Sequence, residues 1–553
     1  MTTVNDTSMK TVSQNTVKTP ETTKGSSPIG STKGSSVNST VIPTVDSPKL
    51  NTSTDKNTDT VVHDEKQDSQ QVSTVGVVDG VDVETQQSQT KPGGKPKQEQ
   101  KRRPPKFAET RGVSGITNFG ATCYMNAALQ ALSATTPFVS YMIHPNSELL
   151  THIEQKIIDD EFLKHEKEDQ LKGVETELNI SVSKTREKAM ETLPYKLRLM
   201  MKRLWAHNCE VQPKQLKKYI DKNIKFFTGG FVQHDSQEFL TALLDNIHET
   251  TKTQGVLDVR FDDDTEQLDE TFKVLESAFS VAKKENDVDT MKAMMEKMNQ
   301  LYSDNKRAYY QIYARRTWTD LMKTSYSVIN DIFSGMCVTT IECNSCHKSY
   351  HKFERFDLLT LHLPETIEEN RAKYSIHDLL SFYTQNETMK NENSYYCMYC
   401  REKKEATKCH SIYQPPSTLV ILIKKYQKYN GNIFKSNVKI EYDHELDLTP
   451  YITPEQPETA NKTPKYELYS VIRHSGGYGG GHYYTYSKNA INNMWYIHDD
   501  GDVYNVDPSD PLMCNGYIMF YRLKQEDPSS KNIEDVQDDS QNTGNSPDPQ
   551  ESK

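Results

Sequence analysis

Hydrophobic and polar positions divide the chain into two polar ends and a long patterned middle. Residues 1–106 are rich in Ser, Thr, Asn, Gln, Lys, Pro and Gly, and they contain no aromatic side chain. Residues 526–553 are also polar and free of aromatics. Neither end can bury enough apolar surface to offset the entropy lost on ordering, so we predict that both are disordered. Residues 107–525 carry every aromatic side chain and are predicted to form the folded domain.

The first part of this middle region is patterned for helices. From Cys123 the apolar positions up to Leu132 recur at helical spacing, directly after a loop marked by glycines. Residues 150–225 are also predicted to be helical, with a largely polar surface. A further helix is expected to begin near Asp235 or Ser236, either of which can cap its first turn.

Residues 262–312 form a charged stretch in which two groups of apolar residues follow helical spacing. The first group is Leu268, Phe272, Leu275 and Phe279, and the second is Met291, Met294, Met295, Met298 and Leu301. This pattern predicts two amphipathic helices, inserted into the domain. We expect their apolar faces to pack on the domain or on each other, although a methionine stripe also suits a groove for a partner.

From residue 338 onward the pattern changes to short strands. Residues 419–423 form a β-branched run suited to a buried strand, and aromatic-rich runs follow it. These later runs lie at 466–472, 482–487, 495–498 and 517–521, separated by Asn, Asp and Gly. A helical first part followed by a sheet-rich second part predicts an α+β fold.

Composition excludes several classes of protein. The chain has 66 basic and 77 acidic side chains, a net charge of −11, which argues against general nucleic-acid binding. It contains no run of 18 apolar residues and begins without a recognisable secretory signal, so no membrane partner is expected. Nine thinly spread cysteines favour reduced thiols in the cytoplasm or nucleus. The oligomeric state stays open.

The two ends differ in charge. Residues 91–106 hold seven basic residues and one acid, including the run from Lys101 to Lys106. This run fits a nuclear localisation signal or a patch for an acidic partner, but a solvated linker is the simpler interpretation. The tail at 526–553 carries eight acids and two lysines. Its negative charge is more than half of the net charge of the chain.

Two identical Cys-x-x-Cys pairs lie in the strand-rich part. Cys343 and Cys346 form the first pair and Cys397 and Cys400 the second, with 50 residues between the pairs. Thiolates on two such turns can close a tetrahedron around one ion, so we predict a structural zinc site. Redox pairs, or a site that has lost its metal, are the alternatives. Three nearby residues are interpreted as bystanders: His347, His351 and Cys409.

A cysteine, a histidine and an acid can be assembled into a nucleophilic site. Cys123 begins a predicted helix, whose partial positive charge favours a thiolate. His482 follows the glycine-rich residues 476–481 and is expected to be the first residue of a strand. A hairpin can place Asp499 beside His482 and orient its ring. Asn118 offers an amide donor for a developing oxyanion.

These residues lie in motifs that resemble those of the ubiquitin-specific proteases, a family of cysteine deubiquitinases. Residues 115–132 resemble the Cys box of that family, and residues 471–500 with 517–521 resemble its His box. Further matches lie at 233–239, 331–335, 356–364 and 415–426. The resemblance covers residues 110–523, and the combination of motifs is specific where a single motif is not.

The resemblance implies a papain-like cysteine protease fold with thumb, palm and zinc-bearing fingers, the fingers spanning residues 343–400. It implies catalytic roles for Cys123, His482 and Asp499, with Asn118 as the oxyanion donor. Asp500 matches an adjacent acid that supports catalysis in some members. The implied activity is hydrolysis of isopeptide or peptide bonds at the C-terminal Gly of ubiquitin, and the implied partners are ubiquitin and ubiquitinated proteins.

The chain departs from the family pattern at several positions. Lys425 and Tyr426 replace the usual Arg and Phe, and His498 stands where Phe usually precedes the acid pair. We expect His498 to be a core replacement, although it could affect the titration of Asp499. Gln233 and His234 could suggest a second active site, but the family resemblance implies that they organise the core.

Two other functions remain open at the level of sequence. One is a catalytically silent ubiquitin-binding scaffold, which loss of Cys123 or His482 would have favoured; both residues are present. The other is a protease for another ubiquitin-like modifier, which the sequence separates poorly because specificity depends on a large protein surface.

Overall fold

The computed structural model describes residues 111–173, 180–206, 208–227, 232–255, 261–364, 373–429, 432–457, 463–477 and 480–524. The predictions of disorder for residues 1–106 and 526–553 therefore lie outside the described residues. Within the described residues, none of the helices is long and apolar enough to cross a membrane.

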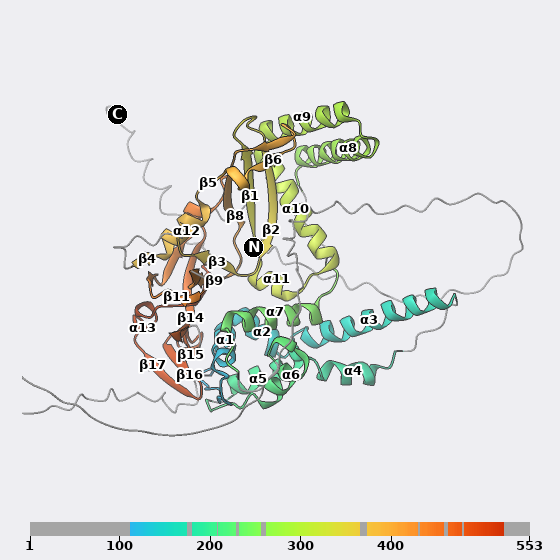
Figure 1. The fold of residues 1–553 in the computed structure, drawn as a ribbon. Helices are drawn as coiled ribbons and strands as arrows, with labels where there is room; N and C mark the ends of the chain where they lie inside the picture. The colour runs from blue at the N-terminus through green and yellow to red at the C-terminus, as the bar shows by residue number, and fades with distance from the viewer. Residues whose placement is uncertain are drawn as a thin grey trace, which may run out of the picture. The chain divides into compact units, whose positions relative to one another are not determined.

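The N-terminal part of the domain is a layer of helices built around α1 (Figure 1). The elements are α1 (Cys123–Ala134), α2 (Thr136–Ile143), α3 (Leu149–Lys172), α4 (Val182–Met190), α5 (Leu193–Ala206), α6 (Lys214–Asn223), η1 (Lys225–Phe227) and α7 (Ser236–Thr251). Helix α1 is buried along almost its whole length because helices cover one side and the main sheet covers the other. The predicted helix start at Cys123 is confirmed.

Helix α7 is fixed at its first turn. The Asp235 carboxylate accepts the backbone N–H of Gln237 at 2.7 Å, which confirms a cap at this position. Its second oxygen accepts the hydroxyl of Tyr517 at 2.7 Å, and Ser236 donates to the carbonyl of Tyr124 in α1 at 2.9 Å. The start of α7 is therefore tied both to α1 and to the sheet.

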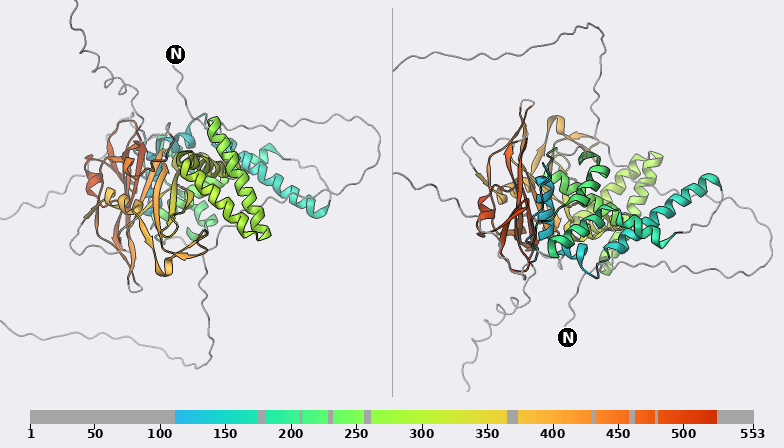
Figure 2. Two further views of the ribbon diagram at one scale, coloured as in Figure 1. Left: turned by 90° about the horizontal axis from the view of Figure 1, so that it is seen from above. Right: turned by 90° about the horizontal axis from the view of Figure 1, so that it is seen from below.

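A second group of helices follows: α8 (Asp263–Glu285), α9 (Val288–Asp304), α10 (Lys306–Thr324) and α11 (Val328–Phe333). Asp262 and Asp287 cap α8 and α9. The two predicted amphipathic helices are present, and α8 and α9 lie side by side (Figures 1 and 2). The end expected at residue 312 falls inside α10, because the apolar contacts of α10 with β1, β2 and β8 and its ionic contacts with α8 continue past it.

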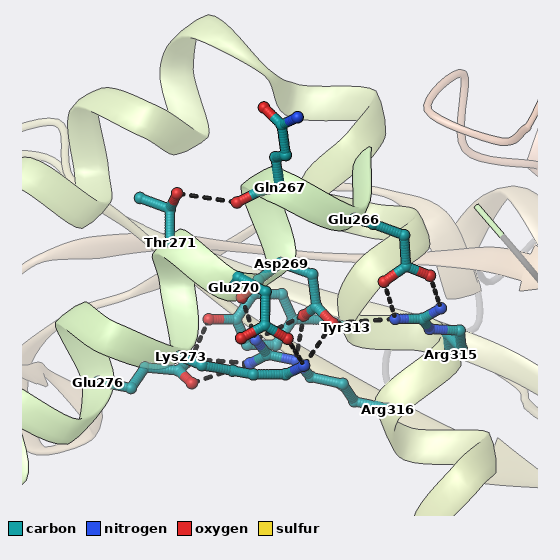
Figure 3. Close-up of polar contacts among 10 residues, drawn as sticks. All are labelled: Glu266, Gln267, Asp269, Glu270, Thr271, Lys273, Glu276, Tyr313, Arg315 and Arg316. Carbon is teal, nitrogen blue, oxygen red and sulfur yellow. Dashed lines mark hydrogen bonds and ion pairs between the residues drawn. The ribbon is translucent and has the colours of Figure 1, made fainter. Parts of the chain in front are cut away.

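A buried carboxylate joins α8 to α10 (Figure 3). The side chain of Asp269 is only 1% exposed and accepts from Arg315 at 2.9 Å and from Arg316 at 2.8 Å. Lys273 adds a contact at 3.1 Å. Burial alone would raise the pKa of Asp269, but hydrogen bonds from Lys273 and Arg316 lower it below its usual value. The carboxylate is thus held charged between the two helices.

Helix α9 has no fully buried residue, and its methionines are half-buried. Besides α8, this helix contacts α10 and β2 through the ring of Tyr302, and it also contacts the segment around the second cysteine pair. Tyr399 donates to the carbonyl of Met295 at 3.4 Å, and Arg401 donates to the carbonyl of Val288 at 3.5 Å. Helix α9 therefore packs within the domain, and its methionine side chains stay partly exposed.

The main sheet has eight strands, in the order β17-β16-β15-β14-β18-β9-β3 with β13 paired to β14. The strands are β3 (Leu359–His362), β9 (Thr418–Lys424), β13 (Glu445–Asp447), β14 (Lys465–Gly477), β15 (Gly480–Lys488), β16 (Trp495–Asp499), β17 (Asp502–Val506) and β18 (Ile518–Leu523). All pairs are antiparallel except β3 with β9. Thr485 donates to the carbonyl of Ala127 at 2.8 Å, which seats β15 on α1.

Strand β15 begins earlier than the sequence predicted. His482 was expected to be its first residue, but the β14–β15 pairing continues through Gly481 and Gly480. Glycines at both strand ends make this possible, because a side chain at Gly481 would meet the carbonyl of Ser475 at 2.2 Å. The catalytic candidate therefore lies inside the strand, two residues from its end.

A four-stranded sheet, ordered β2-β1-β8-β5, forms the fingers. Its strands are β1 (Gly335–Cys343), β2 (Ser349–Phe356), β5 (Glu387–Met389) and β8 (Ala406–Gln414). The remaining elements are β4 (Lys373–Ser375), α12 (Ile376–Thr384), η2 (Asn391–Asn393), β6 (Tyr395–Cys397), β7 (Glu402–Lys404), β10 (Tyr426–Tyr429), β11 (Asn432–Lys435), β12 (Lys439–Glu441), η3 (Thr449–Tyr451) and α13 (Asp510–Met513). The helical layer and the sheets confirm the α+β prediction.

The buried carboxylate gives a first prediction. Asp269→Ala leaves Arg315 and Arg316 without their central partner, so we expect a loss of about 3 kcal/mol in the free energy of unfolding. Amide hydrogen exchange should also accelerate in α8 and α10. Glu270→Ala is the control, because its side chain is 68% exposed and contacts only Lys273. Equal effects of the two substitutions would show that the buried carboxylate has no special role.

Candidate active site and metal site

The turn before α1 positions Cys123. Gly120 has a φ of 82° and Ala121 a φ of 53°, so the chain reverses sharply just before the helix. Asn118 closes this turn, because its side-chain oxygen accepts the backbone N–H of Thr122 at 3.1 Å and the Thr122 hydroxyl at 2.9 Å. Cys123 then becomes the first residue of α1 and is 2% exposed.

The segment before this turn lies directly against the turn between β16 and β17. The backbone N–H of Ile116 donates to the carbonyl of Asp500 at 2.7 Å. A Cβ atom on Gly115 would lie 2.1 Å from the carbonyl oxygen of Gly501, so only glycine fits there. Two segments separated by most of the domain are thereby held in backbone contact.

Asp500 lies at the centre of this junction. Its φ is 52°, and its two carboxylate oxygens accept from different amides: Asn118 at 2.9 Å and Asn126 at 2.8 Å. Asn126 also donates to the carbonyl of Ile116 at 3.2 Å. The structure therefore brings Asn118 and Asp500 together, and one N–H of the exposed Asn118 amide is committed to Asp500.

His482 and Asp499 are paired. Nε2 of His482 lies 2.5 Å from Oδ1 of Asp499 and 4.0 Å from Oδ2 of Asp500. Because Asp499 engages Nε2, the ring presents Nδ1 as its other reactive nitrogen. Within the described part of the chain, the Cys123 thiol and the His482 ring make no hydrogen bond with each other.

The environment of Cys123 does not favour the thiolate on its own. Burial raises the pKa of the Cys123 thiol above its ordinary value, and the negative charge of Asp500 raises it further. Hydrogen bonds from the backbone N–H groups of Tyr483 and Tyr124 act in the opposite direction. The expected effect of the helix start is thus outweighed by desolvation, so ionisation requires a cationic partner close to the sulfur.

The sequence analysis missed the contacts of two residues at this site. Asn126 was placed only as part of a helical run, yet its amide joins Asp500 to the segment before α1. A polar amide within the apolar part of that run was the available signal. Gln233 was expected to organise the core, but it is exposed and hydrogen-bonds to Gly481. His234 does pack on rings, with Tyr124 and Phe227 around it.

His498 is a core residue, as expected. Its side chain is 4% exposed, and burial lowers its pKa to about 4. A hydrogen bond with the backbone of Ser114 opposes that shift, and Nδ1 has no partner in the structure. The ring is therefore neutral at physiological pH, and it links β16 to the segment before Cys123.

Four cysteines meet at the end of the fingers. Cys343, Cys346, Cys397 and Cys400 offer sulfur atoms that all lie within 4.8 Å of one another. Sγ atoms lie 3.6 Å apart for Cys346 with Cys397 and 4.0 Å apart for Cys343 with Cys400. A tetrahedral ion with bonds of about 2.3 Å requires sulfurs about 3.8 Å apart, so the donor set fits a metal.

The three other candidate ligands lie outside this group. His347 is exposed and faces Glu342 at 3.3 Å. His351 contacts the hydroxyl of Thr340 at 3.0 Å, and Cys409 donates to the carbonyl of Thr384 at 3.5 Å. Each has a different partner, in agreement with their interpretation as bystanders.

Comparisons with known proteins agree with this architecture. The sequence model of the family described as "Ubiquitin carboxyl-terminal hydrolase" matches residues 114–521. A probable ubiquitin carboxyl-terminal hydrolase of Acanthamoeba polyphaga mimivirus is 28% identical over 436 residues, covering 74% of this chain and 90% of the relative. Ubiquitin carboxyl-terminal hydrolase 21 of Homo sapiens is 24% identical, covering 75% of this chain and 62% of the relative.

Among solved structures, a SAGA DUB module containing Ubp8 and bound to ubiquitin aldehyde has a TM-score of 0.49 at 19% identity. The match covers 76% of this chain and 71% of that chain. The family match defines the protein as a thiol-dependent hydrolase. Within that class the chain belongs to the ubiquitin carboxyl-terminal hydrolase family.

The buried histidine gives a second prediction. The folded-state pKa of His498 is about 4, below the ordinary value of 6.5, so the unfolded chain binds a proton first as the pH falls. Stability is therefore lost as the pH drops below 6.5. Between pH 7 and pH 5 the wild-type protein should lose free energy of unfolding. We expect this loss to be about 1–2 kcal/mol smaller in His498→Phe.

Chemical denaturation of both proteins across this pH range measures the effect. His377→Phe is a control, because that ring is half-buried and hydrogen-bonds to the hydroxyl of Tyr451 instead of lying in the core beneath the acid pair. Parallel stability curves for wild type and His498→Phe would contradict the prediction.

Proposed function

We propose that this chain is a cysteine deubiquitinase that hydrolyses isopeptide or peptide bonds at the C-terminal Gly of ubiquitin. Family membership supports the reaction class and ubiquitin as the substrate. The observation that carries the residue assignment is the pairing of His482 with Asp499 at the edge of the sheet, joined through Asp500 to the loop before Cys123. Cys123 is the nucleophile, His482 the general base and Asp499 the residue that orients the ring.

The first chemical step begins at Cys123. Nδ1 of His482 takes the thiol proton, and the resulting imidazolium offsets the burial and the Asp500 charge that disfavour a thiolate. Asp499 stabilises this imidazolium through Nε2. The sulfur then attacks the carbonyl carbon of the terminal Gly of ubiquitin, and the carbonyl oxygen becomes negatively charged.

The remaining steps use the same groups. The amide of Asn118 has a second N–H besides the one given to Asp500, and it can donate to the oxyanion. The intermediate collapses to a thioester as the leaving lysine amine takes the proton from His482. Water activated by His482 then hydrolyses the thioester, which releases ubiquitin and returns the thiol to Cys123.

We also propose that the four-cysteine group holds structural zinc. A closed set of four thiolates leaves no open coordination position, so a bound zinc ion would cross-link the two turns without taking part in the reaction. Tyr399 and Arg401, beside the second pair, contact the backbone of α9. Metal binding therefore also supports the helical insertion.

The state of the cysteines supports a reducing location. None of the nine cysteines forms a disulfide, although four of them lie close together. Such a set persists in the cytoplasm or nucleus and is rare in secreted proteins. We propose one of these two locations for the protein.

The third prediction tests the nucleophile and the base. Wild-type protein treated with a ubiquitin that carries a C-terminal electrophile should gain one ubiquitin covalently. Cys123→Ala should give no adduct, and His482→Ala should react roughly 100-fold more slowly because the thiolate loses its base. Intact mass and the labelling rate measure both effects.

Cys209→Ala is the matched control, because Cys209 is exposed and lies outside the site. It should be labelled at the wild-type rate. A folded wild-type protein that gives no adduct with ubiquitin, but does so with another ubiquitin-like modifier, would replace the proposed substrate. An adduct that persists in Cys123→Ala would assign the nucleophile elsewhere.

The fourth prediction concerns the metal. Cys397→Ser should lower the zinc content from one ion per chain and accelerate amide exchange in α9, because the segment holding Tyr399 and Arg401 loses its cross-link. Cys409→Ser is the control. Cys409 hydrogen-bonds to the carbonyl of Thr384, so this variant should keep the zinc content of the wild-type protein. Elemental analysis and hydrogen exchange make the measurement. Wild-type zinc content in Cys397→Ser would contradict the proposed ligand set.

A further inference from the structure

The strand that carries His482 has an unsupported end. Strand β15 pairs with β14 from Gly480 to Ser487, but its pairing with β16 starts only at Thr485. Residues 480–484 therefore have no β16 partner. The first part of this segment is glycine and the preceding turn is glycine-rich, so the backbone next to His482 has few side chains to fix it.

Gln233 replaces the missing strand at this point. Its side-chain oxygen accepts the backbone N–H of Gly481 at 2.9 Å, and its Nε2 donates to the Gly481 carbonyl at 2.9 Å. One donor and one acceptor exchanged with a single residue is the pattern of a hydrogen-bonded pair in an antiparallel sheet. The carboxamide of Gln233 thus supplies what a neighbouring peptide group would supply.

The segment that carries Gln233 is held by hydrogen bonds at the start of α7. Gln233 lies two residues before Asp235, which caps α7 and accepts the hydroxyl of Tyr517. Ser236 ties the same turn to α1 through the carbonyl of Tyr124. The carboxamide therefore connects the hairpin to the helix layer that presents Cys123.

Gly481 is adjacent to two groups that act on the nucleophile. The next residue is His482, paired with Asp499, and the one after it is Tyr483, whose backbone N–H hydrogen-bonds to the Cys123 sulfur. Displacement of Gly481 would move both groups relative to Cys123. Since these bonds are exposed to solvent, their effect on global stability is small compared with their effect on this geometry.

We propose that Gln233 is a positioning residue for the reaction: by clamping the backbone of Gly481, it places His482 and the Tyr483 N–H toward Cys123. This inference rests on the proposed function. It assigns Gln233 no contact with the reacting atoms. An alternative role, direct contact with ubiquitin, predicts a different kinetic result.

The fifth prediction uses two variants of similar size. Gln233→Glu keeps an acceptor for the Gly481 N–H but places a carboxylate against the Gly481 carbonyl, and Gln233→Met loses both bonds. Each should lower kcat about tenfold on a fluorogenic ubiquitin C-terminal amide with KM unchanged, because displaced catalytic groups slow the reaction without altering the ubiquitin surface. Gln170→Glu, which bears its amide on exposed α3 and contacts only Glu166, is the matched control.

A second measurement needs no ubiquitin. The pH dependence of Cys123 alkylation by iodoacetamide, followed by peptide mass spectrometry, reports thiolate formation at this cysteine alone. Its midpoint should move to higher pH in Gln233→Met, because the thiolate loses the Tyr483 N–H and the proposed positive charge on His482. A contact that matters only for folding would leave this midpoint unchanged in the folded protein.

The outcomes separate the inference from the function on which it rests. A raised KM at unchanged kcat in the Gln233 variants would overturn the positioning role in favour of direct contact with ubiquitin. Wild-type kinetics together with a wild-type alkylation midpoint would show that Gln233 has no role in the reaction. If wild-type protein fails to cleave the ubiquitin substrate, the proposed function fails. The alkylation midpoint then still decides whether Gln233 places His482 and the Tyr483 N–H at Cys123.

Discussion

The catalytic centre depends on one backbone contact between the start and the end of the domain. Gly115 lies so close to the carbonyl of Gly501 that no side chain fits between them, and Ile116 donates to the carbonyl of Asp500. This contact sets the helix that begins at Cys123 against the turn that follows Asp499. Cys123 comes from the helical layer and His482 from the sheet, so this junction is what holds the two candidate groups in one site.

Asp500 converts that contact into a defined geometry. Its carboxylate is divided between Asn118 and Asn126, so the loop and the helix on both sides of Cys123 are held by a single group. The same charge disfavours a thiolate at Cys123. The junction therefore gains order at an electrostatic cost to Cys123, and in the proposed mechanism a protonated His482 is the group that offsets this cost. Organisation of the site and the proposed activation consequently depend on different acids, Asp500 and Asp499.

Sequence patterns predicted those features that depend on local spacing. The helix at Cys123, the strand near His482 and the two Cys-x-x-Cys pairs follow from short-range periodicity, and the structure places the four cysteines together. The roles of Asn126 and Gln233 did not follow, because each depends on a hydrogen bond to a residue more than 200 positions away. Residue 312, the expected end of the helical insertion, falls inside α10, which continues by packing on β1 and β8.

The two halves of the domain are stabilised by different means. Around Cys123 the important contacts are backbone approaches and neutral amides, which fix positions closely but need glycine and exact chain paths. In the insertion, Asp269 holds α8 to α10 through buried charges, and the hydroxyl of Tyr310 in α10 reaches His351 of β2 at 3.2 Å. With α9 resting on the second cysteine pair, the insertion and the fingers form one connected structure. The stability of this part should therefore follow its ionic contacts and the proposed metal, whereas the geometry of the candidate catalytic site follows the junction at Gly115.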